Sequence, residues 1–185
     1  MKAQSKNSMP AYALAGVTAI VVAVIAIAGL NALGMVSGTA TVTVQSSVAI
    51  SMPVNSINFG TLYEGGTNNT LGTVPVPFKV QNDGNVKLNV TINATNIFTS
   101  APNPVSNYQY MANVSVPGEG TCFDITQSTT TLTNMPASNN PTKFLTYLND
   151  TNGCDDAEIE VQVTVPVGES AGAKTSTVTL IGSQA

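Results

Sequence analysis

Few residues of this chain could carry out chemistry, and several residue types are absent altogether. The 185 residues include six lysines but no arginine, histidine or tryptophan. Without histidine there is no Ser-His-Asp or Cys-His nucleophile system, no imidazole general base and none of the common zinc sites. Catalysis would need a Ser-Lys or a carboxylate pair, and no recognisable motif marks either. We therefore expect no enzymatic activity and no cofactor.

One cluster of acids surrounds a glycine turn in "NDTNGCDDAEIE". Carboxylate oxygens grouped in a loop are ligands that suit Ca²⁺. The spacing does not fit an EF-hand loop, which requires a glutamate at the twelfth position from its first aspartate. Solvated turn acids are the commoner explanation, so we predict no metal and keep calcium as the alternative. The acids concerned are Asp150, Asp155, Asp156 and Glu158.

Cys122 and Cys154 are the only cysteines. An even count in an exported chain predicts a disulfide, which by the chain-entropy model would stabilise the fold by roughly 3 to 4 kcal/mol. The alternatives are two free thiols or half of a metal site. The metal alternative is weak because the chain has neither histidine nor a second cysteine pair.

Five Asn-x-Ser/Thr triplets could accept N-linked sugars, and none has proline in the middle. If Val86, Leu88, Val90 and Ile92 face the core, the alternating residues between them face water, so the acceptors on that strand point outwards. We expect all five acceptors to be accessible. The alternative is that they are ordinary solvent-facing polar residues. The acceptors are Asn68, Asn89, Asn93, Asn113 and Asn149.

Composition and charge narrow the class of protein. Charged residues make up only 9% of the chain, far below the usual share, and the formal net charge is −4. This balance, with abundant Thr, Ser, Asn and Val, is typical of a strand-rich exported protein. The acidic chain without arginine offers no electrostatic footprint for nucleic acid, so none is expected as a partner.

The first forty residues form a separate segment. Lys2 and Lys6 precede residues 11–36, which carry no charged side chain, and a helix of that length can cross a hydrocarbon core of about 30 Å. "VSGTA" then places small residues where a signal peptidase cuts, between Ala40 and Thr41. Residues 1–40 are therefore either a cleaved signal peptide or a retained membrane anchor, and both put residues 41–185 outside the cell.

Beyond residue 40 the hydrophobic period is two almost to the end, which predicts an all-β domain. In "AEIEVQVTV" the apolar residues Ile159, Val161, Val163 and Val165 alternate with polar ones. "FKVQNDGNVKLNVTINATN" is expected to form a hairpin turned by Asp83-Gly84. Seven to nine short strands, each with one apolar face, favour an immunoglobulin-like or jelly-roll β-sandwich preceded by one hydrophobic helix.

"INFGTLYEGG", "PFKVQNDGNVKLNVTI" and "VTVPVGESAGAKTSTVTL" together resemble the secreted immunoglobulin-like surface domains of archaea. These are similar to the subunits of archaeal threads and bundling pili and to TasA-like bacterial matrix fibres. The resemblance spans residues 41–183. It implies donor-strand complementation, in which an N-terminal strand of one subunit fills a groove in the next. The matching segment is residues 41–52, with its apolar face at Val42, Val44, Val48, Ile50 and Met52.

These observations lead to two functional expectations. The first is a structural subunit of an extracellular filament or surface layer, with other copies of the same chain as its partners. The second is a membrane-anchored adhesin that binds a glycan or another cell-surface protein. Tyr108, Tyr110 and Tyr147 are the only candidate stacking platforms for a sugar.

Overall fold

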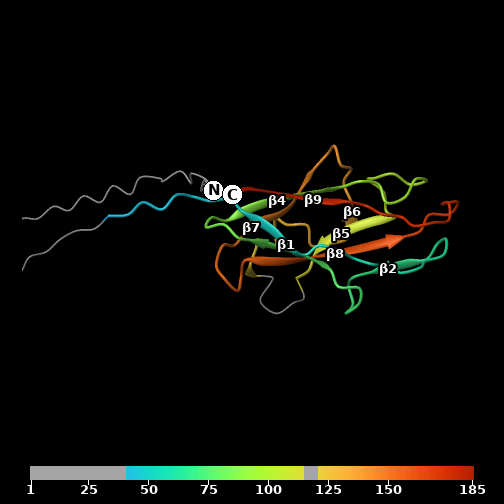
Figure 1. Ribbon diagram of the computed structural model, residues 1–185, viewed down its shortest axis with the longest axis horizontal. Coiled ribbons are helices and arrows are strands. Elements are labelled where there is room, and N and C mark those ends of the chain that lie inside the picture. The colour runs from blue at the N-terminus through green and yellow to red at the C-terminus, as the bar shows by residue number, and fades with distance from the viewer. Residues whose placement is uncertain (1–40, 115–120) are drawn as a thin grey trace, which may run out of the picture. The chain divides into compact units, whose positions relative to one another are not determined.

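The computed structural model of the protein describes residues 41–114 and 121–185 (Figure 1). The predicted hydrophobic helix and the Ala40 side of the predicted cleavage site lie outside these residues. Within them, no helix is long and apolar enough to span a membrane. Ser46–Ala185 forms one compact unit. Its strands are β1 Ile50–Val54, β2 Thr67–Asn69, β3 Phe78–Asn82, β4 Leu88–Ala94, β5 Tyr108–Ala112, β6 Thr133–Asn134, β7 Thr142–Leu148, β8 Asp156–Thr164 and β9 Val178–Gln184.

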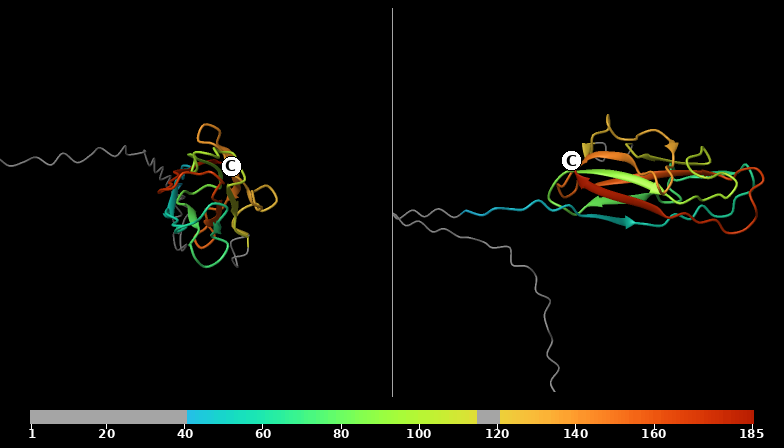
Figure 2. Two further views of the ribbon diagram at one scale, coloured as in Figure 1. Left: turned by 90° about the vertical axis from the view of Figure 1, so that its right-hand side faces the viewer. Right: turned by 90° about the horizontal axis from the view of Figure 1, so that it is seen from above.

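The strands of this unit form two sheets. Within each sheet, all pairs of neighbouring strands are antiparallel. Sheet A has the order β1-β3-β8-β5-β6, with β2 also pairing with β8. Sheet B has the order β7-β4-β9. The all-β prediction is therefore confirmed. Figure 2 shows β1 in cyan and β9 in red as the edge strands that lie on the same side of the two sheets.

The two sheets share one apolar core, to which alternate residues of their strands contribute. Ile159, Val161 and Val163 of β8 are buried, as the sequence pattern predicts, whereas Val165 is only partly buried. The rings of Tyr110 on β5 and Phe144 on β7 meet edge to face across the core, with their centroids 5.5 Å apart. The largest fully buried side chains come from both sheets and from Met135, which follows β6: Tyr110, Phe144, Leu88, Ile92, Met135, Leu145, Leu148 and Ile159.

The predicted hairpin at Asp83-Gly84 is wrong, because β3 belongs to sheet A and β4 to sheet B. The connection crosses between the sheets, and the incoming chain runs beside it: Ala49 accepts a hydrogen bond from Asp83 N, and Ser47 accepts one from Asn85 N. A Cβ at Gly84 would lie only 2.3 Å from the Ser47 carbonyl oxygen. Glycine is needed there for a close approach of two backbones and not for a hairpin turn.

Candidate functional site: an open groove between two edges

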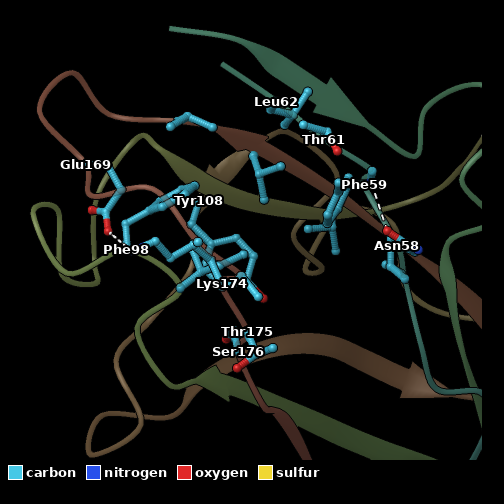
Figure 3. A pocket seen from close by; sticks show the side chains of 18 of the residues that line it. Asn58, Phe59, Thr61, Leu62, Phe98, Tyr108, Glu169, Lys174, Thr175 and Ser176 are labelled. Carbon is cyan, nitrogen blue, oxygen red and sulfur yellow. Dashed lines mark hydrogen bonds and ion pairs between the residues drawn. The ribbon is translucent and has the colours of Figure 1, made fainter. Parts of the chain in front are cut away.

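The described part of the chain contains a groove of about 1180 Å³ (Figure 3). Residues 55–63, after β1, form one wall, and residues 169–176, before β9, form the other. Neither wall belongs to a strand. The floor between them is largely apolar and comes from Phe78, Ile97, Phe98, Tyr108, Val161, Val163 and Val165.

The groove exists because the sheets separate along their β1 and β9 edges. At one end the edges are in contact, since a Cβ at Gly182 of β9 would lie 3.6 Å from the Cβ of Ile50 in β1. Towards the start of β9 a smaller cavity of about 260 Å³ opens between Met52 and Val178, and it also touches Phe78. Phe78 lines the main groove as well, so the two hollows adjoin.

Glu169, which is 8% exposed, attaches the wall of residues 169–176 to the loop that contains Ser100. Its Oε2 accepts hydrogen bonds from Ser100 N at 2.9 Å and from Ser100 Oγ at 2.6 Å, and its Oε1 pairs with Lys174 Nζ at 2.5 Å. The ammonium of Lys174 and the donors of Ser100 lower the pKa of Glu169 from 4.5 to about 2. The carboxylate is therefore ionised at any ordinary pH, and its bonds to Ser100 and Lys174 persist.

Tyr108 forms part of the floor beneath that wall. Its side chain is 3% exposed, and burial raises the pKa of its phenol although a hydrogen bond with the Ser176 side chain lowers it. Ser176 Oγ also donates to Thr95 O at 2.6 Å, so the wall is tied to the loop after β4 as well. The groove thus has a fixed polar rim over an apolar floor.

The predicted N-terminal strand divides into two parts in the structure. Ile50 and Met52 belong to β1, which pairs with β3 of the same chain. Val42 and Val44, 73% and 76% exposed, lie in a stretch without regular secondary structure, and Val48 is 45% exposed. The apolar alternation continues from β1 into the residues that precede it.

The five predicted sugar acceptors differ in their surroundings. The expectation that all of them face solvent is wrong for Asn93, which is 7% exposed. The other acceptors, Asn68, Asn89, Asn113 and Asn149, are partly buried. The period-2 pattern correctly places Asn93 on the outer face of β4, but Ser138 covers it and accepts a hydrogen bond from its Nδ2 at 2.9 Å.

The acids predicted as a calcium alternative serve other purposes. Asp156 pairs with Lys79 at 2.5 Å, and Asp155 accepts a hydrogen bond from Gln81 at 3.2 Å. Among the described residues, no three Asp, Glu, His or Cys side chains are arranged to hold a metal ion. Cys154 of this turn forms a disulfide with Cys122, so the predicted disulfide is confirmed.

Of the three tyrosines considered as sugar platforms, Tyr108 and Tyr110 lie in the core, with 3% and 1% of their surface exposed. Only Tyr147 is available, at 47% exposed. It also has a φ of 57°, a left-handed backbone conformation that is rare for a bulky residue.

Sequence reasoning missed a buried acid on the outer face of sheet A. Glu160 is 2% exposed; the Thr70 hydroxyl donates to its Oε2, and Asn113 Nδ2 donates to its Oε1 at 2.8 Å. Burial raises the pKa of Glu160, and the nearby charge of Glu158 adds to that, while the two hydrogen bonds oppose it. No signal in the strand pattern could reveal this acid, because the loop after β2 covers it.

Comparisons with protein families, with curated proteins and with solved structures found no match to this chain. The function is therefore argued from the groove, from the segment that precedes β1 and from the chemistry of the surface.

Proposed function

We propose that the protein is a structural subunit of an extracellular filament or surface layer and that it polymerises by donor-strand complementation. In this proposal the domain is a β-sandwich of the immunoglobulin-like or jelly-roll type, and its partner is another copy of the same chain. The observation that carries the proposal is the apolar-floored groove between residues 55–63 and 169–176, whose walls belong to no strand.

A β-strand is the occupant that suits such a groove. In this proposal the incoming strand pairs with backbone N–H and C=O groups of the walls, which belong to no strand of the two sheets. The floor offers apolar contacts to alternate side chains of the occupant. Residues 41–48 have that alternation, with Val42, Val44 and Val48 on one side.

The positions of the groove and of the chain entry favour a second copy as the source of the strand. Ser47 accepts from Asn85 N and donates its own N–H to Asn85 Oδ1 at 2.6 Å. This is the end of the unit where Ala185 N bonds Lys87 O, whereas the groove lies beyond Asn55. From Ser47 the chain runs along β1 towards the groove. The residues before Ser47 would therefore have to reverse direction to fill the groove of their own domain.

The setting of the proposed assembly is the cell surface. The disulfide is of the kind found in oxidising, extracellular environments. The adhesin alternative is less well supported, because two of its three candidate aromatic platforms, Tyr108 and Tyr110, are core residues. Membrane attachment through residues 1–40 and contacts with other surface proteins are compatible with either role.

The test is a pair of charge substitutions in the full-length, exported chain. Val44→Asp would place a carboxylate on the apolar floor of the groove, a burial too costly for the strand to bind. Thr43→Asp adds the same charge to the opposite side of the same segment. Electron microscopy of surface material is expected to show filaments for Thr43→Asp and only monomers for Val44→Asp.

N-terminal sequencing of both variants verifies that processing is the same. Filaments of normal number and length from Val44→Asp would contradict the proposal, as would loss of assembly in both variants.

A further inference from the structure

The five Asn-x-Ser/Thr triplets can be ranked by whether the structure leaves their reacting atoms accessible. N-linked glycosylation joins a sugar to the side-chain amide nitrogen, and the triplet is recognised through the hydroxyl two residues later. An acceptor in the folded protein therefore needs an amide nitrogen that is not held by another group. It also needs a reachable hydroxyl.

Three triplets fail this requirement. Asn93 is buried and donates to Ser138 O. Asn113 Nδ2 donates to Glu158 Oε2 at 3.1 Å and to Glu160 Oε1 at 2.8 Å, so a sugar there would take one of the two amide protons and break one of these two bonds.

Asn68 Nδ2 donates to Phe59 O at 3.0 Å, in the wall of the groove. The hydroxyl of its triplet belongs to Thr70, which is fully buried and bonded to Glu160. Neither reacting group of this triplet is therefore accessible.

Two triplets meet the requirement. Asn149 Oδ1 accepts from Asp150 N at 2.9 Å and from the hydroxyl of the exposed Thr151 at 3.4 Å. Asn89 Oδ1 accepts from Tyr147 N at 3.4 Å, and the hydroxyl of its triplet, on the partly buried Thr91, makes only a long hydrogen bond of 3.5 Å to Ile181 O. In both residues the amide oxygen is held by hydrogen bonds, and the amide nitrogen donates to no group in the described part of the chain. The nitrogen can therefore face outwards.

Tyr147 distinguishes the Asn89 site further. The register of β4 against β7 shifts on both sides of Val90, and Tyr147 lies in the irregular stretch with its φ of 57°. Its neighbours Thr146 and Leu148 are buried, whereas Tyr147 is 47% exposed, and its backbone N–H donates to Asn89 Oδ1 at 3.4 Å. Such a bulge redirects a side chain, and strain of this kind concentrates at functional positions.

We propose that Asn89 and Asn149 carry N-linked saccharides and that the ring of Tyr147 supports the sugar attached to Asn89. The sugar donor is a lipid-linked oligosaccharide. Its anomeric carbon forms a bond to the amide nitrogen, its bond to the lipid phosphate breaks with the electron pair leaving on the phosphate, and the amide proton passes to a base of the transferring enzyme. This chain supplies only the acceptor and the platform.

The two sites lie close together on one part of sheet B. Leu88 and Leu148, the neighbours of the two acceptors, are paired in register between β4 and β7. Asn89 pairs with Ser183 near the end of β9, whereas the groove is lined by residues that precede β9. Sugars at these positions leave the groove open, and the proposal does not depend on the filament function.

The first test is glycopeptide mapping by mass spectrometry of the full chain, exported from a secretory host that glycosylates Asn-x-Ser/Thr triplets. Sugar is expected at Asn89 and Asn149 and absent from Asn68, Asn93 and Asn113. Thr91→Val and Thr151→Val should each remove one sugar chain and leave the other. Bare Asn89 or Asn149, or sugar on Asn68, Asn93 or Asn113 in the folded protein, would overturn the assignment.

The second test separates the platform from a merely structural role of Tyr147. The sugar on Asn89 is expected to raise the melting temperature by about 2 °C relative to the unglycosylated Thr91→Val protein. Tyr147→Phe should keep this difference, and Tyr147→Ala should abolish it. An equal difference in the Ala and Phe variants would exclude the platform.

Discussion

Asn82 shows how a single side chain joins the two sheets. It is 2% exposed at the end of β3, and its Nδ2 donates to Val86 O at 2.9 Å, Leu148 O at 3.2 Å and Asn149 O at 2.9 Å. Its Oδ1 accepts from Gly84 N at 3.0 Å. Asn82 thus connects sheet A to the end of β7 in sheet B and shapes the crossing between β3 and β4.

Removing this amide should be costly because four backbone groups, all buried or partly buried, lose their partner. We expect Asn82→Ala to lower the free energy of unfolding by about 3 kcal/mol. Gln81→Ala, next to it and partly exposed, should cost about 0.5 kcal/mol. Urea titrations followed by circular dichroism measure the free energy of unfolding of both variants. Equal losses would show that the hydrogen bonds of Asn82 do not join the two sheets in any special way.

Side chains that follow the strand period could be predicted from sequence, but side chains covered by a loop could not. Leu88, Val90 and Ile92 are buried as their alternation requires. Glu160 and Asn93 occupy the opposite, outward phase of their strands and are nevertheless buried. Thr70 covers Glu160, and Ser138 covers Asn93. Both covering residues come from distant parts of the chain.

At the scale of elements, local signals identified strands but not their partners. "NDG" between two apolar runs is a strong hairpin signal, and β3 and β4 flank it as expected. The strands nevertheless join different sheets, because β3 pairs with β1 and β8 whereas β4 pairs with β7 and β9. The groove was equally inaccessible to sequence reasoning, since it arises where residues 55–63 and 169–176 do not pair.

The wall of residues 169–176 should respond to acid through Glu169. Its folded pKa of about 2 lies below the ordinary value of 4.5, so the stabilising contacts are fully present above pH 4.5 and are lost as pH falls towards 2. We expect hydrogen exchange of residues 170–177 to report constant opening free energies from pH 7 to 5 and smaller ones near pH 2.5.

The control for this prediction is Glu64, a second glutamate, which accepts a hydrogen bond from the residue before Glu169. Glu169→Gln removes the charge that pairs with Lys174, so the wall should open more readily at pH 7, with little further change in acid. Glu64→Gln alters an exposed acid whose Oε1 accepts from Gly168 N at 3.2 Å, and it should behave like the natural chain. If acid weakens the wall equally in the Glu169→Gln protein, another group controls it.

At the scale of the whole molecule, the proposed contact is head-to-tail. The segment that donates a strand and the groove that receives it are different surfaces, so the interface is heterologous. Repetition of such an interface gives an open filament unless the rotation between subunits closes a ring. One end of a filament would then present a free donor segment and the other an empty groove.

This polarity leads to a prediction about mixtures. A Val44→Asp copy keeps its groove, so it can bind the donor end of a growing filament, but it then presents a donor segment that the next groove rejects. Co-production of the natural chain with increasing amounts of Val44→Asp should therefore shorten surface filaments in inverse proportion to the fraction of the variant, as measured by electron microscopy. Thr43→Asp copies should be incorporated without shortening. If subunits instead associated through the faces of their sheets, the variant would be incorporated without ending growth. An unchanged distribution of filament lengths would therefore rule out strand donation as the link between subunits.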